Sequence, residues 1–269
     1  PFAQAVYLSF IKYVVTSPSD IGRFVGMRNY EAVIWSYYFP EAVTNTIIFT
    51  VISVTLILTA AIGVSLALNV NLKGVGIVRF LILIPWAIPP TAAGLMWRFV
   101  WDSYGWFNKL GYLFFGMPQV YLMGRERWIQ TILIMISQLW QQLPFCVILI
   151  TAALLLIPKE VIDSALVDGA GAWQRFRYVT FPFMRTVIAL VAAYQALLAI
   201  TVYDVVYVFT GGTWGMISYY AFAETFQWTN FGRGAAVSMV IAITTLLVIV
   251  IILRVLPVEK MYKYTFVGE

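Results

Sequence analysis

Five long stretches without a charged side chain limit what this chain can fold into. They are residues 45–68, 80–97, 128–157, 186–203 and 234–253. An apolar helix of about 20 residues crosses a bilayer, and lipid offers no hydrogen-bond partner to a backbone N–H or C=O group. Each stretch is therefore predicted to be a membrane-spanning helix. Charged residues make up only 11% of the chain, against roughly 25% in soluble domains, so a water-soluble fold would lack charged surface.

Residues 1–11 are apolar but too few to cross a bilayer. The chain starts without a methionine, so we interpret this stretch as the end of an earlier helix whose start lies outside the sequence. A periplasmic tail left by removal of a signal peptide is the alternative. The predicted fold is an all-α, polytopic membrane protein with six helices, the first truncated at its start, in a single transmembrane domain over 1–269.

Prolines interrupt two of the stretches. Pro85, Pro89 and Pro90 lie within 80–97, and Pro144 lies within 128–157. They predict kinks, which a membrane tolerates where neighbouring helices or cavity water satisfy the freed carbonyl groups.

Several function classes are excluded by what the sequence lacks. There is no histidine, so the usual metal ligand and neutral-pH general base are missing. The single Cys146 forms no intrachain disulfide and is read as a small buried apolar residue. No P-loop motif occurs, and the basic residues are scattered rather than clustered. We therefore expect no enzyme activity, no metal or cofactor on this chain, and no nucleic-acid partner.

The connection 158–182 is too charged to lie in lipid. Pro158 suits the first turn of a helix, and Glu160 and Asp163 would favour the positive end of its dipole. Three residues share one helical face: Ile162, Ala165 and Leu166. Two glycines predict its end: Gly169 and Gly171. The pattern predicts a short amphipathic helix beside the membrane, and leaves open whether it is a plain cytoplasmic linker or a docking helix.

The same connection resembles the "EAA" loop of permease subunits in binding-protein-dependent ABC importers. It retains five residues of the family pattern: Asp168, Gly169, Ala170, Phe176 and Pro182. It departs at the first two letters, where Asp163 replaces Glu and Ser164 replaces Ala. The carboxylate is kept, one methylene shorter.

Four further segments resemble the sugar permeases of this family, in the same order along the chain. Residues 24–30 are similar to "FVGLDNY", with Met27 and Arg28 as departures, and residues 83–89 to "LPWAIP". Residues 203–212 are similar to "FDxIYVLTGGGP", and residues 231–238 to "DFGxGAALS". Together they indicate the carbohydrate-uptake branch, on the side of the maltose/trehalose permease first subunit.

The resemblance implies an assembly in the plasma or inner membrane. The subunit would pair with a second permease subunit, and ATP-binding subunits would hold ATP and Mg²⁺ and perform the hydrolysis. An extracytoplasmic sugar-binding protein would deliver solute. The helix at about 159–168 would insert into a cleft on an ATPase, with Asp163 meeting a basic residue there. The expected coupling residues are Glu160, Asp163, Ser164, Ala165, Asp168, Gly169, Ala170, Phe176 and Pro182.

A sugar pathway needs polar groups for hydroxyls and aromatic faces for sugar rings. A buried amide in a membrane helix is costly unless it is paired, so polar residues inside the stretches are candidates. They are Gln138, Trp140, Gln141, Gln142, Tyr194, Gln195, Tyr203, Asp204 and Tyr207. The alternative is that such residues hydrogen-bond between helices and stabilise the bundle. For Asp204, a functional role and a place in interfacial water both remain open.

The middle of each stretch contains no Lys or Arg, which favours a neutral di- or oligosaccharide of the trehalose or maltose type. Glycerol-phosphate or another polar solute is the alternative, although a phosphate would favour a basic pathway. A stand-alone secondary transporter would usually show mid-span charges and an internal repeat. A structural membrane scaffold would explain the spans but not the loop. Outside the spans, residues 220–228 are expected to form a half-buried helix.

Overall fold

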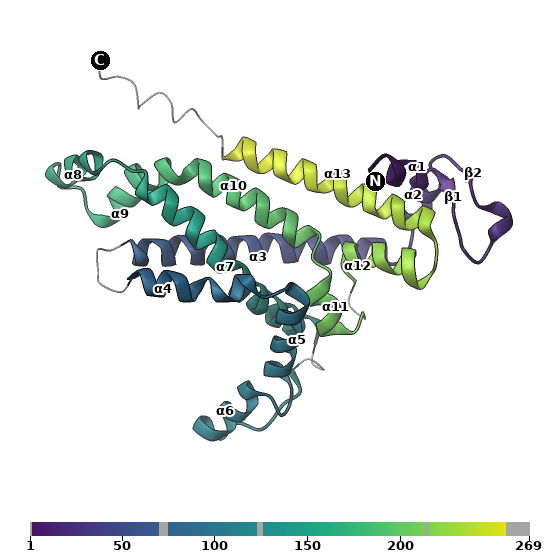
Figure 1. Cartoon of the computed structure of the whole chain (residues 1–269), viewed down its shortest axis with the longest axis horizontal. Helices are drawn as coiled ribbons and strands as arrows, with labels where there is room; N and C mark the ends of the chain where they lie inside the picture. The colour runs from purple at the N-terminus through teal and green to yellow at the C-terminus, as the bar shows by residue number, and fades with distance from the viewer. Residues whose placement is uncertain (1, 70–74, 123–125, 213–214, 257–269) are drawn as a thin grey trace, which may run out of the picture. The chain divides into compact units, whose positions relative to one another are not determined.

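A computed structural model describes residues 2–69, 75–122, 126–212 and 215–256 of the chain (Figure 1). Within these ranges the chain is almost entirely helical, with one two-stranded hairpin. It divides into two compact units, made of Pro1–Ser53, Pro89–Gln138 and Ala196–Leu247, and of Val54–Ile88, Leu139–Gln195 and Val248–Glu269.

Four of the five predicted spans are confirmed as long apolar helices. They are α3 (Phe39–Leu68), α7 (Arg127–Leu155), α10 (Phe181–Ile200) with the turns before it from Ala172, and α13 (Phe231–Val255). In the most apolar segment of each helix, 17% of α13 and 28% of α3 is buried within this chain. The corresponding shares are 50% for α7 and 56% for Ala172–Ile200. This chain therefore leaves most of the apolar surface of α13 and α3 uncovered, while α7 and α10 carry more of the protein core.

The second predicted span is not one kinked helix, and that prediction is wrong. The stretch divides into α4 (Val75–Ile82), the 3₁₀-helix η2 (Ile84–Ala87) and α5 (Pro90–Trp101). Ile88 and Pro89 between them are extended, with ψ of 129° and 140°. Each of these two residues precedes a proline, which disfavours helical dihedrals. The composition still suits a membrane, as a broken span or a re-entrant loop.

The fourth span also differs from its prediction at the end. α10 stops at Ile200, and Tyr203 is the N-cap of a separate helix, α11 (Asp204–Thr210). The glycine turn at 211–212 follows it, with φ of +60° and +80°. α7, in contrast, continues through Pro144.

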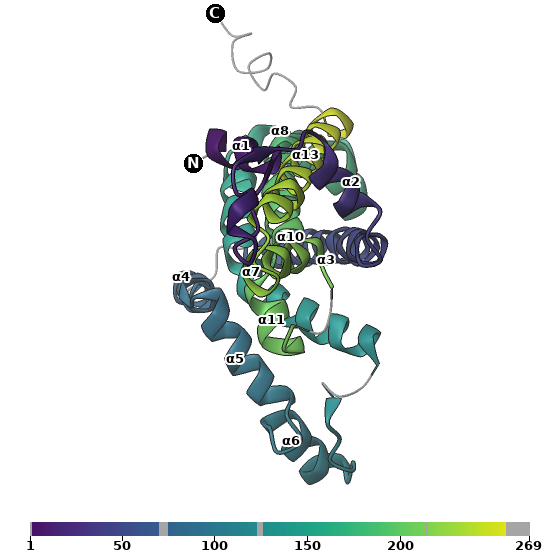
Figure 2. The same ribbon diagram turned by 90° about the vertical axis from the view of Figure 1, so that its right-hand side faces the viewer.

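The first unit contains several short elements besides parts of the long helices. They are α1 (Phe2–Ser9), β1 (Ile11–Lys12), η1 (Pro18–Asp20), β2 (Arg23–Phe24), α2 (Arg28–Ile34), α5, α6 (Trp106–Phe115), α11, α12 (Ile217–Phe222) and the π-helix η5 (Ala223–Gln227). The hairpin pairs Ile11 with Phe24, and Lys12 forms an ion pair with Asp20. The predicted helix over 220–228 is confirmed in place by α12 and η5. Figures 1 and 2 both show α11 beside α5, where the Arg98 guanidinium donates to the Val208 carbonyl at 2.8 Å.

A clamp in the first unit joins two sequence motifs that lie far apart in the chain. The Asn29 amide is buried and donates to the Ser9 and Ile11 carbonyls at 2.9 and 2.8 Å. A Cβ on Gly232 of α13 would lie 2.5 Å from the Ile11 oxygen and 3.0 Å from Asn29 Nδ2. Only glycine therefore lets the start of α13 approach this backbone. The clamp accounts for Asn29 in the 24–30 motif and for Gly232 in the 231–238 motif.

The second unit holds α4, η2, α8 (Lys159–Val167), α9 (Ala172–Arg175) and the π-helical turn η4 (Phe176–Thr180). Its core is built from the long helices and includes the buried Cys146, Ile150, Met184 and Val191. Cys146 is thus the buried apolar residue that its sequence context predicted. Ile162 of α8 and Val179 of η4 pack against this core, which anchors the loop 158–182 to the bundle.

Candidate coupling loop and solute pathway

The amphipathic helix predicted in the loop is present as α8. Pro158 is its extended N-cap residue, and Asp168 is its C-cap. Ser164 donates through its hydroxyl to the Glu160 carbonyl at 2.7 Å, which ties two of the predicted coupling residues along the helix. The carboxylates of Glu160, Asp163 and Asp168 are all exposed. α8 therefore presents an acidic surface while Ile162 fixes it to the protein.

The Asp-Gly-Ala sequence ends α8 in a Schellman motif. Gly169 has φ +74°, in the left-handed region, and its N–H donates to the Leu166 carbonyl at 3.0 Å. The N–H of Ala170 donates to the Ala165 carbonyl at 3.0 Å. These two bonds satisfy carbonyl groups that every helix C-terminus leaves free, and the left-handed residue between them is usually glycine. The family spacing Asp168-Gly169-Ala170 is thus the spacing of a helix stop.

The chain after the stop is held by short-range contacts. The Arg175 guanidinium donates to the Ala170 carbonyl at 2.8 Å, and the Gly171 N–H donates to the Gln174 side-chain oxygen at 2.8 Å. The half-buried Phe176 ring lies 5.6 Å from Trp173 and 6.1 Å from Phe181 of α10, centre to centre. The remaining predicted residue, Pro182, is exposed in the first turn of α10.

The loop also exposes large apolar side chains. Val167 is 88% exposed and Trp173 70% exposed, and Leu166 and Tyr178 are exposed as well. No contact within the part of the chain that the structure describes covers them. Acidic and apolar groups are thus displayed together, which is the composition expected of a surface that meets another protein.

Two of the predicted pathway amides are engaged with protein acceptors. Gln141 is 3% exposed and donates to the Ile88 carbonyl at 2.7 Å, at the break between η2 and α5. Gln195 is 2% exposed and donates to Cys146 Sγ at 2.9 Å, which joins α10 to α7. Both contacts are of the stabilising kind that the sequence left as an alternative. Gln142 differs, because its buried side-chain oxygen has no hydrogen-bond partner among the described residues.

One remaining candidate of the second unit, Tyr194, lies near a stacked pair of rings. Trp86 stacks on Phe145 at 5.2 Å between ring centres with planes 14° apart, and Phe145 lies 5.1 Å from Tyr194. Tyr194 is 38% exposed, whereas Trp140 is half-buried. In the first unit, Gln138 of α7 is buried at 7% exposure. Direct contact of these residues with solute stays a prediction.

Two candidates at the start of α11, Tyr203 and Tyr207, form an aromatic cluster with residues that were not predicted from the sequence. Tyr203 lies 5.5 Å from Tyr207 and 4.7 Å from Phe222 of α12, centre to centre. Tyr207 is 40% exposed, and its ring also lies 6.5 Å from that of Tyr219. Asp204 is exposed beside them. The only signal for Tyr219 and Phe222 was the aromatic spacing within 217–228, which does not say what the rings face.

The first unit also contains a buried carboxyl group outside the spanning helices. Glu224 of η5 is 3% exposed, and the Tyr220 hydroxyl donates to it at 3.0 Å. The same hydroxyl lies 3.0 Å from the Ser36 hydroxyl. Burial raises the pKa of Glu224 above its ordinary value, although the Tyr220 hydrogen bond and Arg233 act in the opposite direction. The folded protein therefore holds a proton on Glu224 at pH values where an unfolded chain has lost it.

This predicts that stability falls as pH rises above the ordinary glutamate pKa, because the unfolded chain then binds fewer protons than the folded one. Glu224→Gln should flatten that part of the profile, since an amide oxygen still accepts the Tyr220 hydrogen bond. Thermal melting of the detergent-purified protein at several pH values checks this. Glu160→Gln, on the exposed side of α8, is the control. An unchanged slope in the Glu224 variant would show that another group titrates.

Comparison with known proteins places this arrangement among transport proteins. The family described as "Binding-protein-dependent transport system inner membrane component" matches residues 60–261. The trehalose transport system permease protein SugA of Mycobacterium tuberculosis is 29% identical over 243 residues, which cover 90% of this chain and 77% of that protein. The trehalose/maltose transport system permease protein MalF of Thermococcus litoralis is 32% identical, over 86% of this chain and 79% of its own.

Solved structures show the same fold. A chain of a bacterial alginate ABC transporter, solved in complex with an alginate pentasaccharide-bound periplasmic protein, superposes with a TM-score of 0.75 at 22% identity. The match covers 94% of this chain and 87% of that one. It confirms the predicted all-α, polytopic membrane fold.

Proposed function

Because the chain belongs to the binding-protein-dependent transport system inner membrane components, we propose that it forms half of the pathway of an ATP-driven importer for a neutral di- or oligosaccharide. Family membership makes it a multi-pass inner-membrane permease subunit of an ABC importer of the carbohydrate-uptake type. The proposal adds the solute class, the role of the loop 158–182, and the partners that the loop and the outer side would meet.

The observation that carries the coupling role is α8 itself. The helix is anchored by Ile162, stopped by Gly169, and leaves Asp163 and two further carboxylates in solvent. A rigid acidic helix of this kind fits a groove with basic walls on an ATP-binding subunit. ATP and Mg²⁺ would be held by that partner, and closure of the ATPases would push α8. The helices would then alternate between inward-open and outward-open arrangements around a mid-membrane solute site.

Aromatic and polar groups of the first unit support a sugar as the solute. The apolar face of a sugar ring stacks on aromatic rings, and its hydroxyls need amide or carboxylate partners. Tyr207 with its neighbouring rings offers the first kind of group, and the exposed Asp204 offers the second. The related permeases named above carry trehalose or maltose in their names, which makes these disaccharides the favoured solutes.

The proposal is tested with the assembled transporter in lipid. ATP hydrolysis is measured with and without the sugar-binding protein, across a panel of trehalose, maltose, longer oligosaccharides and glycerol-phosphate. Stimulation by one sugar-loaded binding protein supports the proposal and names the solute. Stimulation by glycerol-phosphate alone, or solute movement by the purified chain without nucleotide, overturns it.

Tyr207→Ala is expected to raise the sugar concentration needed for half-maximal transport about 2- to 12-fold, since an aromatic stacking contact contributes roughly 0.5–1.5 kcal/mol. Sugar uptake into proteoliposomes measures the change. Tyr7→Ala, on α1 at 60% exposure, is the matched control and should leave uptake unchanged. Equal effects of both substitutions would remove Tyr207 from the pathway.

A further inference from the structure

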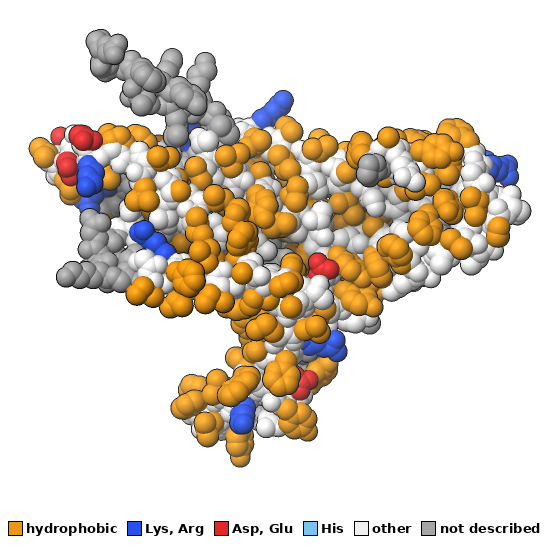
Figure 3. Space-filling model, viewed as in Figure 1, with side chains coloured by type: hydrophobic (Ala, Val, Ile, Leu, Met, Phe, Trp, Pro, Cys, Tyr) orange, Lys and Arg blue, Asp and Glu red, His pale blue; other side chains and the backbone are white. Residues whose placement is uncertain are grey.

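The helix α6 exposes large apolar side chains on every side except the one at Asn108 and Gly111. Its ten residues contain one charged side chain, Lys109. Leu113, Phe114 and Phe115 are 71%, 70% and 77% exposed, and successive helical residues point about 100° apart. Trp106, Phe107, Leu110 and Tyr112 are exposed as well. Figure 3 shows hydrophobic side chains gathered over this part of the first unit.

α6 is nevertheless fixed in place. Gly105 lets it follow α5 closely, because a Cβ there would lie 2.2 Å from the Phe99 carbonyl oxygen. The Asn108 side chain donates to the Asp102 and Val120 carbonyls at 2.8 and 2.9 Å and accepts from the Val120 N–H at 3.0 Å. This clasp folds the segment after the helix back against it. The exposed apolar surface is therefore a built feature and not a frayed end.

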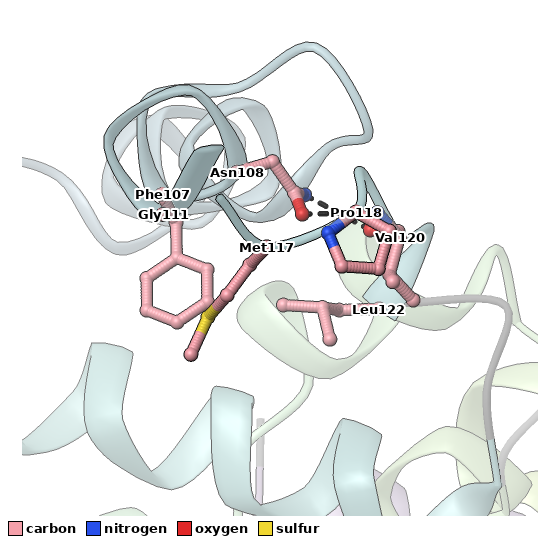
Figure 4. A pocket seen from close by; sticks show the side chains of 7 residues that line it. All are labelled: Phe107, Asn108, Gly111, Met117, Pro118, Val120 and Leu122. Carbon is pink, nitrogen blue, oxygen red and sulfur yellow. Dashed lines mark hydrogen bonds between the residues drawn. The ribbon is translucent and has the colours of Figure 1, made fainter. Parts of the chain in front are cut away.

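A cavity of about 220 Å³ lies between α6 and the returning segment. It is lined by Phe107, Asn108, Gly111, Met117, Pro118, Val120 and Leu122 (Figure 4). Asn108 is the only polar side chain of the lining, and both its oxygen and its nitrogen are hydrogen-bonded to backbone groups. The lining thus offers apolar contacts and no free hydrogen-bonding side chain, which disfavours water as the occupant.

Water, protein and lipid would cover α6 differently. Water is unfavourable because a contiguous apolar surface of this kind costs free energy when hydrated. The exposed residues cover every side of α6 except the one at Asn108 and Gly111, where the returning segment packs. A protein docked on one face would leave much of this surface in water, whereas lipid chains reach all of it. Ten residues span about 15 Å, roughly half of a hydrocarbon core, so α6 does not cross the membrane.

The polar ends of the exposed side chains indicate how deep α6 lies in the membrane. Trp106 and Tyr112 have amphipathic rings that favour the boundary between hydrocarbon and headgroups. The Lys109 amine lies 5.8 Å from the centre of the Trp106 ring, from where it reaches lipid phosphates. α6 is also the last part of the apolar stretch Gly76–Ala87 and Pro90–Phe115, whose composition suits a membrane.

We propose that α6 and its returning segment lie within one leaflet, at the membrane–water boundary, with lipid acyl chains covering the side chains from Trp106 to Phe115. The element is a lipid-embedded anchor at the end of α5. Since one spanning helix, α7, separates it in sequence from the loop 158–182, this leaflet is the one opposite that loop. The proposal does not depend on which solute is carried.

The test uses the assembled transporter in lipid nanodiscs. Cys146 is the single cysteine of the chain, so Cys146→Ala gives a background for single-cysteine labelling, with partner subunits that lack accessible thiols. An environment-sensitive fluorophore is placed by Phe114→Cys and, on another face, by Leu113→Cys. Leu246→Cys on α13, 63% exposed, is the lipid control, and Ser19→Cys in η1 is the aqueous control.

Nitroxide-labelled lipids are expected to quench both α6 labels as they quench the label at Leu246, while aqueous iodide quenches only the label at Ser19. Nitroxides near the headgroups should act more strongly on α6 than those deep in the chains. Iodide quenching at either α6 position would overturn the proposal. Protection of either label from both quenchers would overturn it as well, because a protein would then cover the helix.

Discussion

Replacing Gly169 by valine is expected to abolish most of the ATP hydrolysis that the sugar-binding protein stimulates. Gly169 has φ +74° at the stop of α8, a conformation that costs other residues roughly 1–2 kcal/mol and β-branched residues more. A cost of 2 kcal/mol lowers the population of the observed loop about 30-fold. Nothing lies within 4 Å of an added Cβ, so the effect comes from the backbone and not from a clash. Stimulated ATPase activity of the complex measures it.

A series of substitutions at Gly169 distinguishes the cost of the left-handed backbone conformation from a general loss of folding. Gly169→Asn should retain more activity than Gly169→Ala, and alanine more than valine, because asparagine tolerates the left-handed region. Gly171→Ala is the matched control, since Gly171 is extended at φ −66° and ψ 165° and its nearest neighbour to an added Cβ is 3.7 Å away. Full stimulated activity in the valine variant, or equal losses at Gly169 and Gly171, would contradict the coupling role of the helix stop.

Gly232→Val is expected to prevent recovery of a stably folded protein. The added Cβ would lie 2.5 Å from the Ile11 carbonyl and 3.0 Å from Asn29 Nδ2, and both belong to the clamp. Relief would require breaking the two buried hydrogen bonds of Asn29, at about 1–3 kcal/mol for each group left unpaired. Together with overpacking this approaches the stability of a typical domain. Yield in the membrane fraction and the melting temperature measure the loss.

Gly63→Val is the control for this prediction. It makes the same substitution within a spanning helix, α3, but no atom lies within 4 Å of the added Cβ. It should fold at nearly the normal yield. If both variants were recovered equally, close approach at Gly232 would not be limiting and the clamp would be dispensable.

Local rules predicted much of this structure, and contacts between distant residues account for most of what they missed. Runs of apolar residues located α3, α7, α10 and α13, since a spanning helix satisfies its own backbone. The helix α8 and its stop at Gly169 followed from spacing and glycine alone. The break at Ile88 was missed because apolar content does not distinguish a kinked helix from an interrupted one. The signal was nevertheless present, as two consecutive residues there each precede a proline.

The candidate site divides in the same way. The predicted coupling residues Glu160, Asp163 and Ser164 of α8 are exposed where an amphipathic helix puts them, and Ala165 is half-buried, so the sequence sufficed for their placement. The pathway residues depend on tertiary contacts. No local pattern shows that Gln141 hydrogen-bonds Ile88 or that Gln195 reaches Cys146, since their partners are 53 and 49 residues away. Asn29 and Gly232 of the clamp lie still farther apart in the sequence, and the role of each residue is understood only from its contact with the other.

The hydrogen bond from Gln141 to Ile88 has a mechanical consequence. α7 runs without interruption to Leu155, three residues before Pro158, where the loop begins. Leu155 and Gln141 are separated by about 21 Å along this helix. If α8 couples to an ATPase as proposed, a displacement of the loop would reach the interruption at Ile88 through α7, whose Gln141 amide holds the Ile88 carbonyl. Gln141 thus links the interrupted segment to the helix that leads into the loop.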